Sequence, residues 1–393
     1  MIVNKLYTHI IPDISQWPIH KLSDHRKIFV KEINEFTFER IKELYPESNG
    51  IKDLISKTVY LERIRLKEEP WKVDPPKEKA FWKKISQKIL SAETLQIEDR
   101  KIVEDEILKL IINRYSEEIV GTFKKNMFLF ARYFLKIFFS TLLKSVKPFS
   151  LKRNTESNFI IKGEIEELRN LFNKGTVIIV PTHFSNLDSI LVGYAIDTYV
   201  GLPSFSYGAG LNLYNTGYTA YFMNRLGAYR VDRRKKNPVY LETLKAMSNL
   251  SIQRGTNSLF FPGGTRSRSG SMEEKLKLGL LSTAVEAQRR LLQNKDNTKI
   301  FIVPLIIGYH FVLEAQFLIE HHLKQIGKEK YLPSRDEFTS FRKILKFSWL
   351  IASKGNEITL SFGQPLDVLG NPINKNGESI GANGQIVNIK DYF

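Results

Sequence analysis

The residues best suited to catalysis are a histidine and an aspartate in the stretch VIIVPTHFSNLDSILVGY, residues 177–194. His183 and Asp188 stand five positions apart between two apolar runs, in a chain with only seven histidines. A carboxylate that binds one ring nitrogen fixes the tautomer of a histidine and leaves the other nitrogen as a base. Such a base raises the nucleophilicity of a bound hydroxyl and contributes roughly 10²–10⁴-fold to a rate. The pair is therefore a candidate general base.

The two side chains can meet in only one kind of local structure. On a continuous helix the five-residue offset separates them by about 140°, and on a strand it places them on opposite faces. Contact requires His183 to follow a strand and Asp188 to lie in the first turn of a helix. The sequence favours this junction, because Pro181 ends a β-branched run and Ser185 and Asn186 are preferred N-cap residues. The alternative is structural: Asp188 caps the helix beside a histidine that satisfies buried backbone groups.

The composition narrows the possible partners. The chain has 393 residues, a formal charge of +17, 42% hydrophobic residues and no cysteine. Its length predicts one large domain and a smaller one, and its charge predicts anionic partners such as nucleic acid, an anionic membrane leaflet or phosphorylated small molecules. The absence of cysteine excludes a thiol nucleophile, a disulfide framework and Cys-based zinc sites. The N-terminus lacks the features of a secretory signal and no apolar run is long enough to span a bilayer, so we expect a cytosolic or membrane-peripheral protein.

Hydrophobic periodicity divides the chain at about residue 150. Residues 1–150 place apolar side chains three and four positions apart among charges, which predicts an all-helical N-terminal region. Residues 151–393 alternate short β-branched runs with amphipathic stretches, which predicts an α/β domain with a mixed, mostly parallel sheet flanked by helices. The glycine- and asparagine-rich tail beyond Phe362 is expected to be loop. The expected strands are 176–181, 227–231, 257–262, 299–307 and 357–362.

One helical segment, residues 124–147, combines cations with aromatic bulk. Lys125, Arg132 and Lys136 fall near one stripe of the helix, and phenylalanines and leucines cover much of the rest. The internal cations make this segment unsuited to crossing a bilayer. It either lies in the interface of a membrane, with its basic stripe toward the headgroups, or packs on the protein's own core with snorkelling lysines.

Arginines gather at the ends of two expected strands further along the chain: they are Arg230, Arg233, Arg234, Arg266 and Arg268. The last two follow Pro262-Gly263-Gly264, a bend at which backbone N–H groups can approach a ligand closely. Guanidinium forks with neighbouring hydroxyls suit a phosphate monoester. Each cluster by itself is weak evidence for a site, because runs of charge are usually solvated surface.

Taken in order, four segments resemble the conserved blocks of the glycerophospholipid acyltransferase family, which includes glycerol-3-phosphate and 1-acylglycerol-3-phosphate acyltransferases. HFSNLD (183–188) resembles the HxxxxD block, and GAYRVDR (227–233) resembles the Gly-aromatic-Arg block. FPGGTRSRSG (261–270) and VPLII (303–307) are similar to the third block and to the Pro-containing strand of the fourth. The resemblance covers about residues 163–309.

The resemblance implies a role for each matching residue. These are a catalytic dyad of His183 and Asp188, an acceptor-phosphate site of Arg233, Arg266 and Arg268, a substrate or oxyanion turn of Gly263, Gly264 and Thr265, and an acyl pocket at Val303 and Pro304. It further implies transfer of a fatty acyl group from acyl-CoA or acyl carrier protein to a hydroxyl of glycerol 3-phosphate or 1-acylglycerol 3-phosphate. We also expect the protein to bind the cytoplasmic face of an anionic membrane. No nucleic acid, metal or cofactor is expected. Direct transfer without an acyl-enzyme fits the lack of Cys and of a GxSxG elbow.

The third block departs from the family at Gly263, where a glutamate is usual. Plastid-type glycerol-3-phosphate acyltransferases also lack this glutamate, so the departure is compatible with activity. The alternatives are an acyl-thioester hydrolase, an acyltransferase for another alcohol, and a lipid-binding member that has lost catalysis. A nucleic-acid binder is suggested by charge alone, and the aromatic residues do not interleave with the basic ones as such a surface requires.

Overall fold

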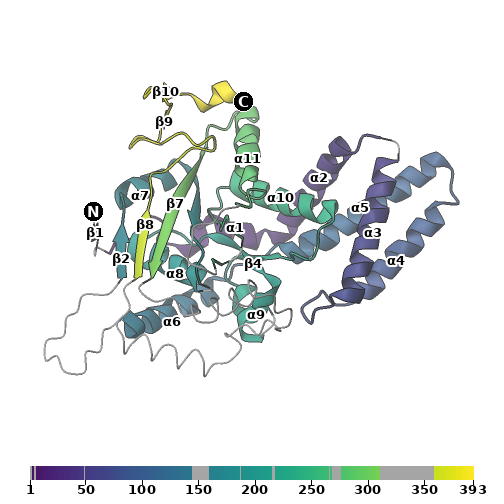
Figure 1. Ribbon diagram of the computed structural model, residues 1–393, viewed down its shortest axis with the longest axis horizontal. Helices are drawn as coiled ribbons and strands as arrows, with labels where there is room; N and C mark the ends of the chain where they lie inside the picture. The colour runs from purple at the N-terminus through teal and green to yellow at the C-terminus, as the bar shows by residue number, and fades with distance from the viewer. Residues whose placement is uncertain are drawn as a thin grey trace, which may run out of the picture. The chain divides into compact units, whose positions relative to one another are not determined.

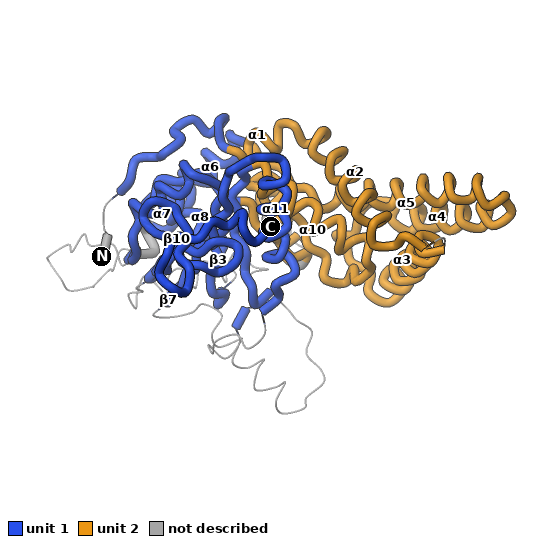
Figure 2. Tube along the Cα trace, turned by 90° about the horizontal axis from the view of Figure 1, so that it is seen from above, with its two compact units in different colours: residues 1–17, 125–205, 255–393 blue, residues 18–124, 206–254 orange. Residues whose placement is uncertain are grey.

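A computed structural model describes residues 2–3, 6–47, 49–143, 159–185, 187–214, 217–264, 266–267, 276–309 and 358–393. The chain forms two compact units, which Figure 2 distinguishes by colour. Unit 1 contains residues 1–17, 125–205 and 255–393, and unit 2 contains residues 18–124 and 206–254. Each unit is therefore assembled from parts of the chain that are far apart in the sequence.

Unit 1 is built around a mixed, mostly parallel sheet. Its strands are β1 (Ile2–Val3), β2 (Phe159–Lys162), β3 (Gly175–Pro181), β6 (Ser258–Leu259), β7 (Lys299–Tyr309) and β8 (Ile358–Phe362). In the order β1-β2-β8-β7-β3-β6, three neighbouring pairs are parallel, while β1 with β2 and β7 with β8 are antiparallel. The middle of β3, Val177 to Ile179, is buried on both faces, as expected of a strand that helices cover on each side.

The sheet of unit 1 is accompanied by helices, several of which are labelled in Figure 1. They are η1 (Ile14–Gln16), α6 (Lys125–Leu143), α7 (Ile165–Phe172), α8 (Asp188–Ala195), the π-helical turn η2 (Ile196–Val200), α11 (Ser282–Gln293) and η5 (Ile389–Tyr392). In α7, for example, Ile165, Leu168 and Leu171 are buried at intervals of three residues. This spacing places them on one face of the helix.

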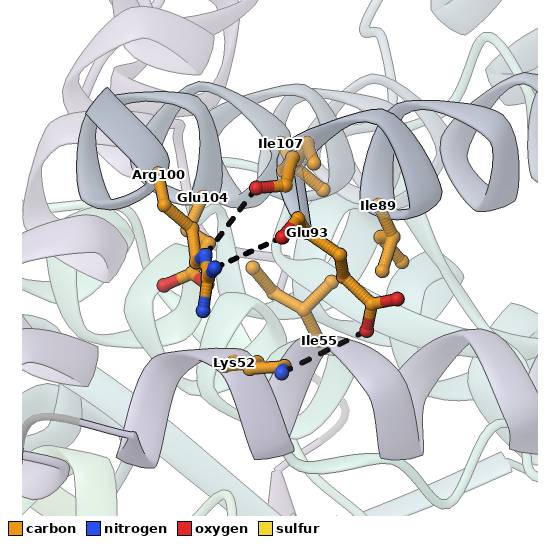
Figure 3. Close-up of a pocket in the computed structure, with 8 residues that line it drawn as sticks. Lys52, Ile55, Ile89, Glu93, Arg100, Glu104 and Ile107 are labelled. Atoms are coloured by element: carbon orange, nitrogen blue, oxygen red, sulfur yellow. Dashed lines mark hydrogen bonds and ion pairs between the residues drawn. The ribbon is translucent and has the colours of Figure 1, made fainter. Parts of the chain in front are cut away.

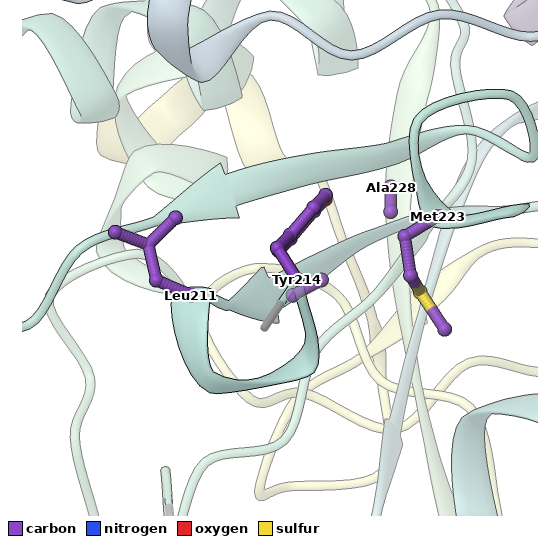
Figure 4. Packing of buried hydrophobic residues seen from close by; sticks show 5 residues of the cluster. Leu211, Tyr214, Met223 and Ala228 are labelled. Carbon is purple, nitrogen blue, oxygen red and sulfur yellow. The ribbon is translucent and has the colours of Figure 1, made fainter. Parts of the chain in front are cut away.

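Unit 2 is mostly helical. Its elements are α1 (Pro18–Asp24), α2 (Arg26–Leu44), α3 (Gly50–Glu68), α4 (Glu78–Ala92), α5 (Ile97–Ile119), β4 (Ser206–Gly210), η3 (Leu211–Tyr214), α9 (Gly217–Met223), β5 (Ala228–Val231) and α10 (Pro238–Gln253). Strands β4 and β5 are parallel to each other. Beside them, Leu211, Tyr214, Met223 and Ala228 form a small apolar cluster (Figure 4). The side chain of Asn237 caps α10 by accepting a hydrogen bond from Tyr240 N at 2.9 Å.

The start of α3, the end of α4 and the first half of α5 surround a very small cavity, shown in Figure 3. Its volume is only about 10 Å³, and Ile55, Ile89 and Ile107 lie around it. The Arg100 guanidinium closes this end by donating to the carbonyls of Ala92 and Glu93, at 3.3 and 3.0 Å. These carbonyls belong to the last turn of α4 and its cap, which a cation stabilises. The cavity is packing detail and has no room for a ligand.

A buried ionic network ties α3 to α4. The Arg65 guanidinium bonds to Glu62 on the same helix at 2.8 Å. It also reaches Asp74 and Glu78, at 2.8 and 3.3 Å. Burial alone would lower the pKa of Arg65, but the charges of Glu62 and Asp74 outweigh it and raise that pKa. The guanidinium is therefore fixed as a cation inside unit 2, where its partners offset the cost of desolvation.

A second buried pair fixes the loop between β5 and α10. The Lys235 ammonium, whose side chain is wholly buried, contacts the Glu118 carboxylate near the end of α5. It also lies over the rings of Tyr115 and Tyr240, 5.2 and 5.6 Å from their centroids. Burial raises the pKa of Glu118 and the charge of Lys235 opposes that rise. The loop is thus held to the helices by charge as well as by packing.

The structure confirms the predicted fold class: a mixed, mostly parallel sheet flanked by helices, with helices from α1 to α6 preceding it. Two element predictions were wrong. The strand expected at 257–262 is only Ser258–Leu259, because the chain turns at the Pro-Gly-Gly bend. The tail expected to be loop contains the antiparallel pair β9 (Ser379–Ile380) and β10 (Ile386–Val387), joined through a turn in which Gly384 N donates to Gly381 O at 2.9 Å.

Replacing Lys235→Met should destabilise the protein by about 3–5 kcal/mol, because Glu118 is then a buried charge without its partner. A carboxyl whose pKa is higher in the folded state than in the unfolded state loses stability as pH rises through those values. The deficit of the variant relative to the parent should therefore be smaller at about pH 5 than at about pH 8. Urea unfolding at both pH values measures it.

The matched variant is Lys235→Met with Glu118→Leu, which removes both charges and should recover most of the lost stability. A single variant as stable as the parent at either pH would contradict this assignment of the pair.

Candidate active site

His183 and Asp188 lie at the strand-to-helix junction that their contact requires. Strand β3 ends at Pro181 and helix α8 begins at Asp188. The Nδ1 atom of His183 is 2.8 Å from Oδ2 of Asp188. This distance is that of a good hydrogen bond, with Nδ1 donating to the carboxylate. The structure thus brings together the two residues that the sequence pairs.

The Asp188 carboxylate is completely buried and accepts hydrogen bonds on both oxygens. Besides His183, the backbone N–H groups of Phe184 and Ser185 donate to Oδ2 at 2.7 and 2.9 Å. The hydroxyl of Tyr309, at the end of β7, donates to Oδ1 at 2.5 Å. Four donors compensate the desolvation of a buried anion. They also fix the carboxylate in the orientation that holds the imidazole.

The predicted N-cap at Ser185 or Asn186 is not what the structure shows. The N-cap of α8 is Leu187, with no side-chain cap, and Asn186 lies outside the described residues. Instead, Asp188 turns back toward the residues before the helix and binds their N–H groups. The hydroxyl of Ser185 accepts from Leu187 N at 3.1 Å within the same bend. The acidic residue therefore organises the loop that carries His183 instead of closing the helix.

Phe261 and Ser267, from the block that begins at Phe261, also contact His183. The centroid of the His183 ring is 4.4 Å from that of Phe261, with 37° between the ring planes. The carbonyl of His183 accepts a hydrogen bond from Ser267 N at 2.8 Å. The side chain is about 20% exposed, and Nε2 has no hydrogen-bond partner among the described residues. Nε2 is therefore the nitrogen that can take a proton from a bound molecule.

The Pro-Gly-Gly bend is a closed turn. Gly264 N donates to Phe261 O at 3.1 Å, and Gly264 adopts a φ of +67°, a conformation that glycine adopts without strain. A Cβ at Gly264 would stand 2.7 Å from Cδ of Lys277. The N–H of Gly263 has no acceptor among the described residues. Of the predicted oxyanion turn, Gly264 N is thus committed to the turn, and Gly263 N is the group left to face a ligand.

The remaining predicted site residues fall in three places. Arg266 is described and partly buried, one residue before the Ser267 N–H that binds His183. Thr265 and Arg268 lie outside the described residues. Val303 is fully buried in β7, while Pro304 is partly buried and its carbonyl accepts from Gly363 N at 2.9 Å.

The basic segment after β5 belongs to unit 2, and its cations differ in their roles. Arg234 bonds to Asp232 at 2.8 Å and to Asp74 at 2.5 Å. Arg230 donates to Asn224 Oδ1 at 2.8 Å and lies over the Tyr214 ring. Arg233 is exposed and pairs with no carboxylate among the described residues. Of the three arginines that the sequence singles out in this segment, Arg234 is held by carboxylates, Arg230 has neutral partners, and Arg233 is the exposed one.

Tyr309 is the functional residue that the sequence did not identify. It ends the buried strand β7, which pairs in parallel with β3, and Thr182 N donates to Leu305 O at 3.0 Å just beyond β3. The carboxyl ends of parallel strands meet at one edge of a sheet. A hydroxyl at the end of a strand paired with β3 could therefore have been expected near His183, but the sequence does not reveal which strands are neighbours.

Two cations of the basic stripe expected on helix α6 pair with acidic side chains of unit 1. The Arg132 guanidinium points into unit 1 and forms a two-point pair with Asp197, at 2.6 and 2.8 Å. It also lies over the rings of Trp17 and Phe128. Lys125 pairs with Asp13 at 3.3 Å. Two of the predicted stripe cations are therefore used within unit 1, because a short helix on a protein core leaves its cations close to acidic partners.

The side of α6 turned to solvent is mostly apolar, although Lys136 is also exposed there. Leu129, Phe130, Tyr133, Phe134 and Ile137 are 42–68% exposed, at spacings of one, three and four residues. On the opposite face Phe139 is buried and stacks on Tyr194 of α8 at 4.7 Å between centroids. Residues 144–147 of the predicted helix lie outside the described residues. Within the described ranges no helix combines the length and hydropathy needed to cross a bilayer.

Metal ligation has no candidate in the part of the chain that the structure describes, where no three His, Asp or Glu side chains gather. The chemistry of the described site is that of an imidazole, a buried carboxylate and backbone donors.

Part of the chain is similar to known proteins. Residues 162–308 match the family model described as Acyltransferase. The chain is 30% identical to a glycerol-3-phosphate acyltransferase of Aeromonas hydrophila over 212 residues, which are 53% of this chain and 24% of that protein. It is 29% identical to that of Alteromonas mediterranea over 206 residues (52% and 24%), and 25% identical to that of Pseudomonas putida over 258 residues (65% and 28%). The chain thus spans about a quarter of the length of these curated relatives.

Replacing Tyr309→Phe removes one of the four donors to Asp188 without changing the shape of the side chain. A hydrogen bond to a charged group contributes about 1.5–3 kcal/mol, so the free energy of unfolding should fall by about that amount. Urea unfolding measures it. The control is Tyr392→Phe, at a tyrosine that is 60% exposed, which should leave stability unchanged. Equal effects at both positions would contradict the assigned role of the Tyr309 hydroxyl.

Proposed function

We propose that the protein is an acyltransferase that moves a fatty acyl group from a thioester to a hydroxyl of a glycerol phosphate, a proposal supported by the match of residues 162–308 to the family model described as Acyltransferase. The observation that carries the proposal is the His183–Asp188 pair, with a buried and four-fold bonded carboxylate behind an imidazole whose Nε2 is open. This is the arrangement of a general base. The acceptor we propose is glycerol 3-phosphate, because the matched relatives carry that name.

The proposed reaction is a direct transfer. Nε2 of His183 takes the proton of the acceptor hydroxyl as its oxygen attacks the thioester carbonyl. Asp188 stabilises the imidazolium that forms. The tetrahedral intermediate then breaks its C–S bond, and the leaving thiolate takes the proton back from His183. The products are an ester and a free thiol, and the base returns to its starting state without an acyl-enzyme.

The oxyanion of the intermediate requires a donor close to the base. Gly263 N is the group that we assign, since Gly264 N is already bonded to Phe261 O. The bend lies beside the base, as the contact between the rings of Phe261 and His183 indicates. A preorganised backbone donor of this kind typically contributes about 10²–10³-fold to kcat. A glutamate at Gly263 is not needed for this role, because the donor is the main chain.

The acceptor phosphate is assigned to arginines. Arg266 is one residue from the Ser267 N–H that binds the His183 carbonyl, so it lies close to the base in space although the two are far apart in the chain. Arg233, exposed and without an acidic partner among the described residues, and Arg268 complete the proposed set. A guanidinium binds phosphate in a two-point geometry, which fixes the orientation of the hydroxyl as well as the affinity. Val303 and Pro304 are proposed to border the acyl chain.

We further propose that the protein binds the cytoplasmic face of an anionic membrane through α6. The neighbouring side chains of Leu129, Phe130, Tyr133, Phe134 and Ile137 are all exposed, and an exposed apolar surface of this kind marks an interaction site. The net charge of +17 attracts an anionic leaflet. In this arrangement the apolar face of α6 enters the membrane interface, while Arg132 stays paired with Asp197 inside unit 1. Products with long acyl chains could then leave directly into the bilayer.

The function is tested by assaying acyl transfer from palmitoyl-CoA and from palmitoyl-acyl carrier protein, with glycerol 3-phosphate, its 1-acyl derivative, or no acceptor. We expect an ester product that depends on glycerol 3-phosphate. The variant His183→Ala should lose about 10²–10⁴-fold in kcat while its urea midpoint stays near that of the parent. Release of free fatty acid regardless of acceptor would indicate a hydrolase instead. A folded His183→Ala protein with normal turnover would contradict the proposed mechanism.

The membrane role is tested with vesicles of phosphatidylglycerol and phosphatidylcholine. Phe130→Glu combined with Phe134→Glu should weaken sedimentation with these vesicles at least tenfold, because each buried Phe contributes about 1.5–3 kcal/mol. The control is Tyr392→Glu, another exposed aromatic of unit 1, which should bind like the parent. Binding that survives the α6 changes would exclude this helix as the contact.

A further inference from the structure

Unit 2 contains a groove between α3 and α4 that the proposed reaction does not use. Its volume is about 900 Å³, and the two helices that form it run side by side in both views (Figures 1 and 2). Val59, Leu66 and Trp82 are buried along its floor. A groove of this kind between two helices is a common place for another helix to dock.

The rim of the groove is basic. Arg63 and Lys67 come from α3, and Lys79 and Lys83 come from α4. All four are exposed, and none pairs with a carboxylate of the described residues. The groove has no Asp or Glu in its lining, which consists of Ser56, Val59, Tyr60, Arg63, Ile64, Leu66, Lys67, Lys79, Trp82, Lys83, Ser86, Gln87 and Leu90. The four acidic residues of α3 and α4 do not line the groove, so no carboxylate of the lining offsets its positive charge.

The two ends of the groove differ in character. The cations stand where α3 ends and α4 begins, at Lys67 and Lys79. Toward the other end the exposed side chains are apolar, with Tyr60 and Leu90 each 64% exposed. An occupant must therefore carry negative charge over one half of its length and apolar side chains over the other.

The length of the groove favours a helix over a small anion as its occupant. Its α3 side runs from Ser56 to Lys67, about 17 Å at 1.5 Å per residue. That is three turns of a helix, whereas a phosphate or diphosphate is bound by a compact set of donors. A second copy of this chain is a poor occupant, because each copy carries a net charge of +17 and the two would repel.

We propose that the α3–α4 groove docks an acidic amphipathic helix of the carrier protein that delivers the acyl group as a thioester. The inference rests on the proposed acyl transfer, since it identifies the donor of that reaction. Acidic side chains of the carrier pair with Arg63, Lys67, Lys79 and Lys83, and its apolar side chains cover Tyr60 and Leu90. The electrostatic part steers association and the apolar part prolongs it.

The test compares two donors that share an acyl chain, palmitoyl-acyl carrier protein and palmitoyl-CoA, with glycerol 3-phosphate as acceptor. The variant Arg63→Glu with Lys83→Glu should raise KM for the carrier-protein donor at least tenfold. It should leave kcat, and KM for the CoA donor, within about twofold of the parent. A second variant, Tyr60→Ser with Leu90→Ser, should raise the same KM without a change of charge.

The matched control is Lys27→Glu with Lys101→Glu, two exposed lysines of unit 2 outside the groove, which changes the net charge equally and should leave both KM values unchanged. Equal rises for both donors, a rise in the control variant, or no rise in the groove variants would overturn the proposal. So would a parent enzyme that uses palmitoyl-CoA alone, in which case the proposed acyl transfer itself stands.

If the enzyme uses neither donor, the proposed function is wrong. A binding measurement then tests the docking proposal independently of activity. Calorimetry with unacylated acyl carrier protein should then show a complex that the groove variants abolish and the control variant keeps. The absence of any complex with the parent would overturn the docking proposal.

Discussion

The buried carboxylate of Asp188 is the constraint on which the active-site structure depends. An anion with no exposed surface is tolerated only where donors surround it, and here the donors come from three sources: the imidazole, the backbone of the preceding bend and the hydroxyl of Tyr309. Satisfying one side chain thus fixes the path from β3 to α8, the end of β7 and the orientation of His183. The same interactions that hold the fold at this edge of the sheet prepare the base.

Much of this arrangement could be predicted from the sequence, because it follows from local rules. The β-branched run ending at Pro181 and the acidic start of the next helix define a strand-to-helix junction, the only local structure in which an offset of five residues allows contact. The alternation of short strands and amphipathic helices likewise determines the class of sheet. Patterns of this kind depend on neighbours in the chain, and a single sequence displays them directly.

What the sequence could not supply depends on neighbours in space. Tyr309 lies 121 positions from Asp188, and only the pairing of β7 with β3 places it at the carboxylate. Arg234 and Lys235 look like their exposed neighbours in the run DRRKK, yet Asp74 and Glu118 hold them inside unit 2. Arg132 belongs by its spacing to a basic stripe, yet Asp197 turns it inward. A cation cannot be assigned to an anionic ligand until the carboxylates near it in the fold are known.

The difference between cations with and without a carboxylate partner shows how to interpret the large positive charge of the chain. Cations with a carboxylate partner, such as Arg65, Arg132 and Lys235, hold elements together and offer little to a ligand. Among the cations that have no acidic partner in the described residues, four line one groove in unit 2, and Arg233 follows the strand that resembles an acceptor block. A groove carries an energetic cost when like charges face each other across it. That cost persists in the free protein and is relieved when an anionic partner binds, so the placement of unpaired cations is a more specific indication of partners than the net charge.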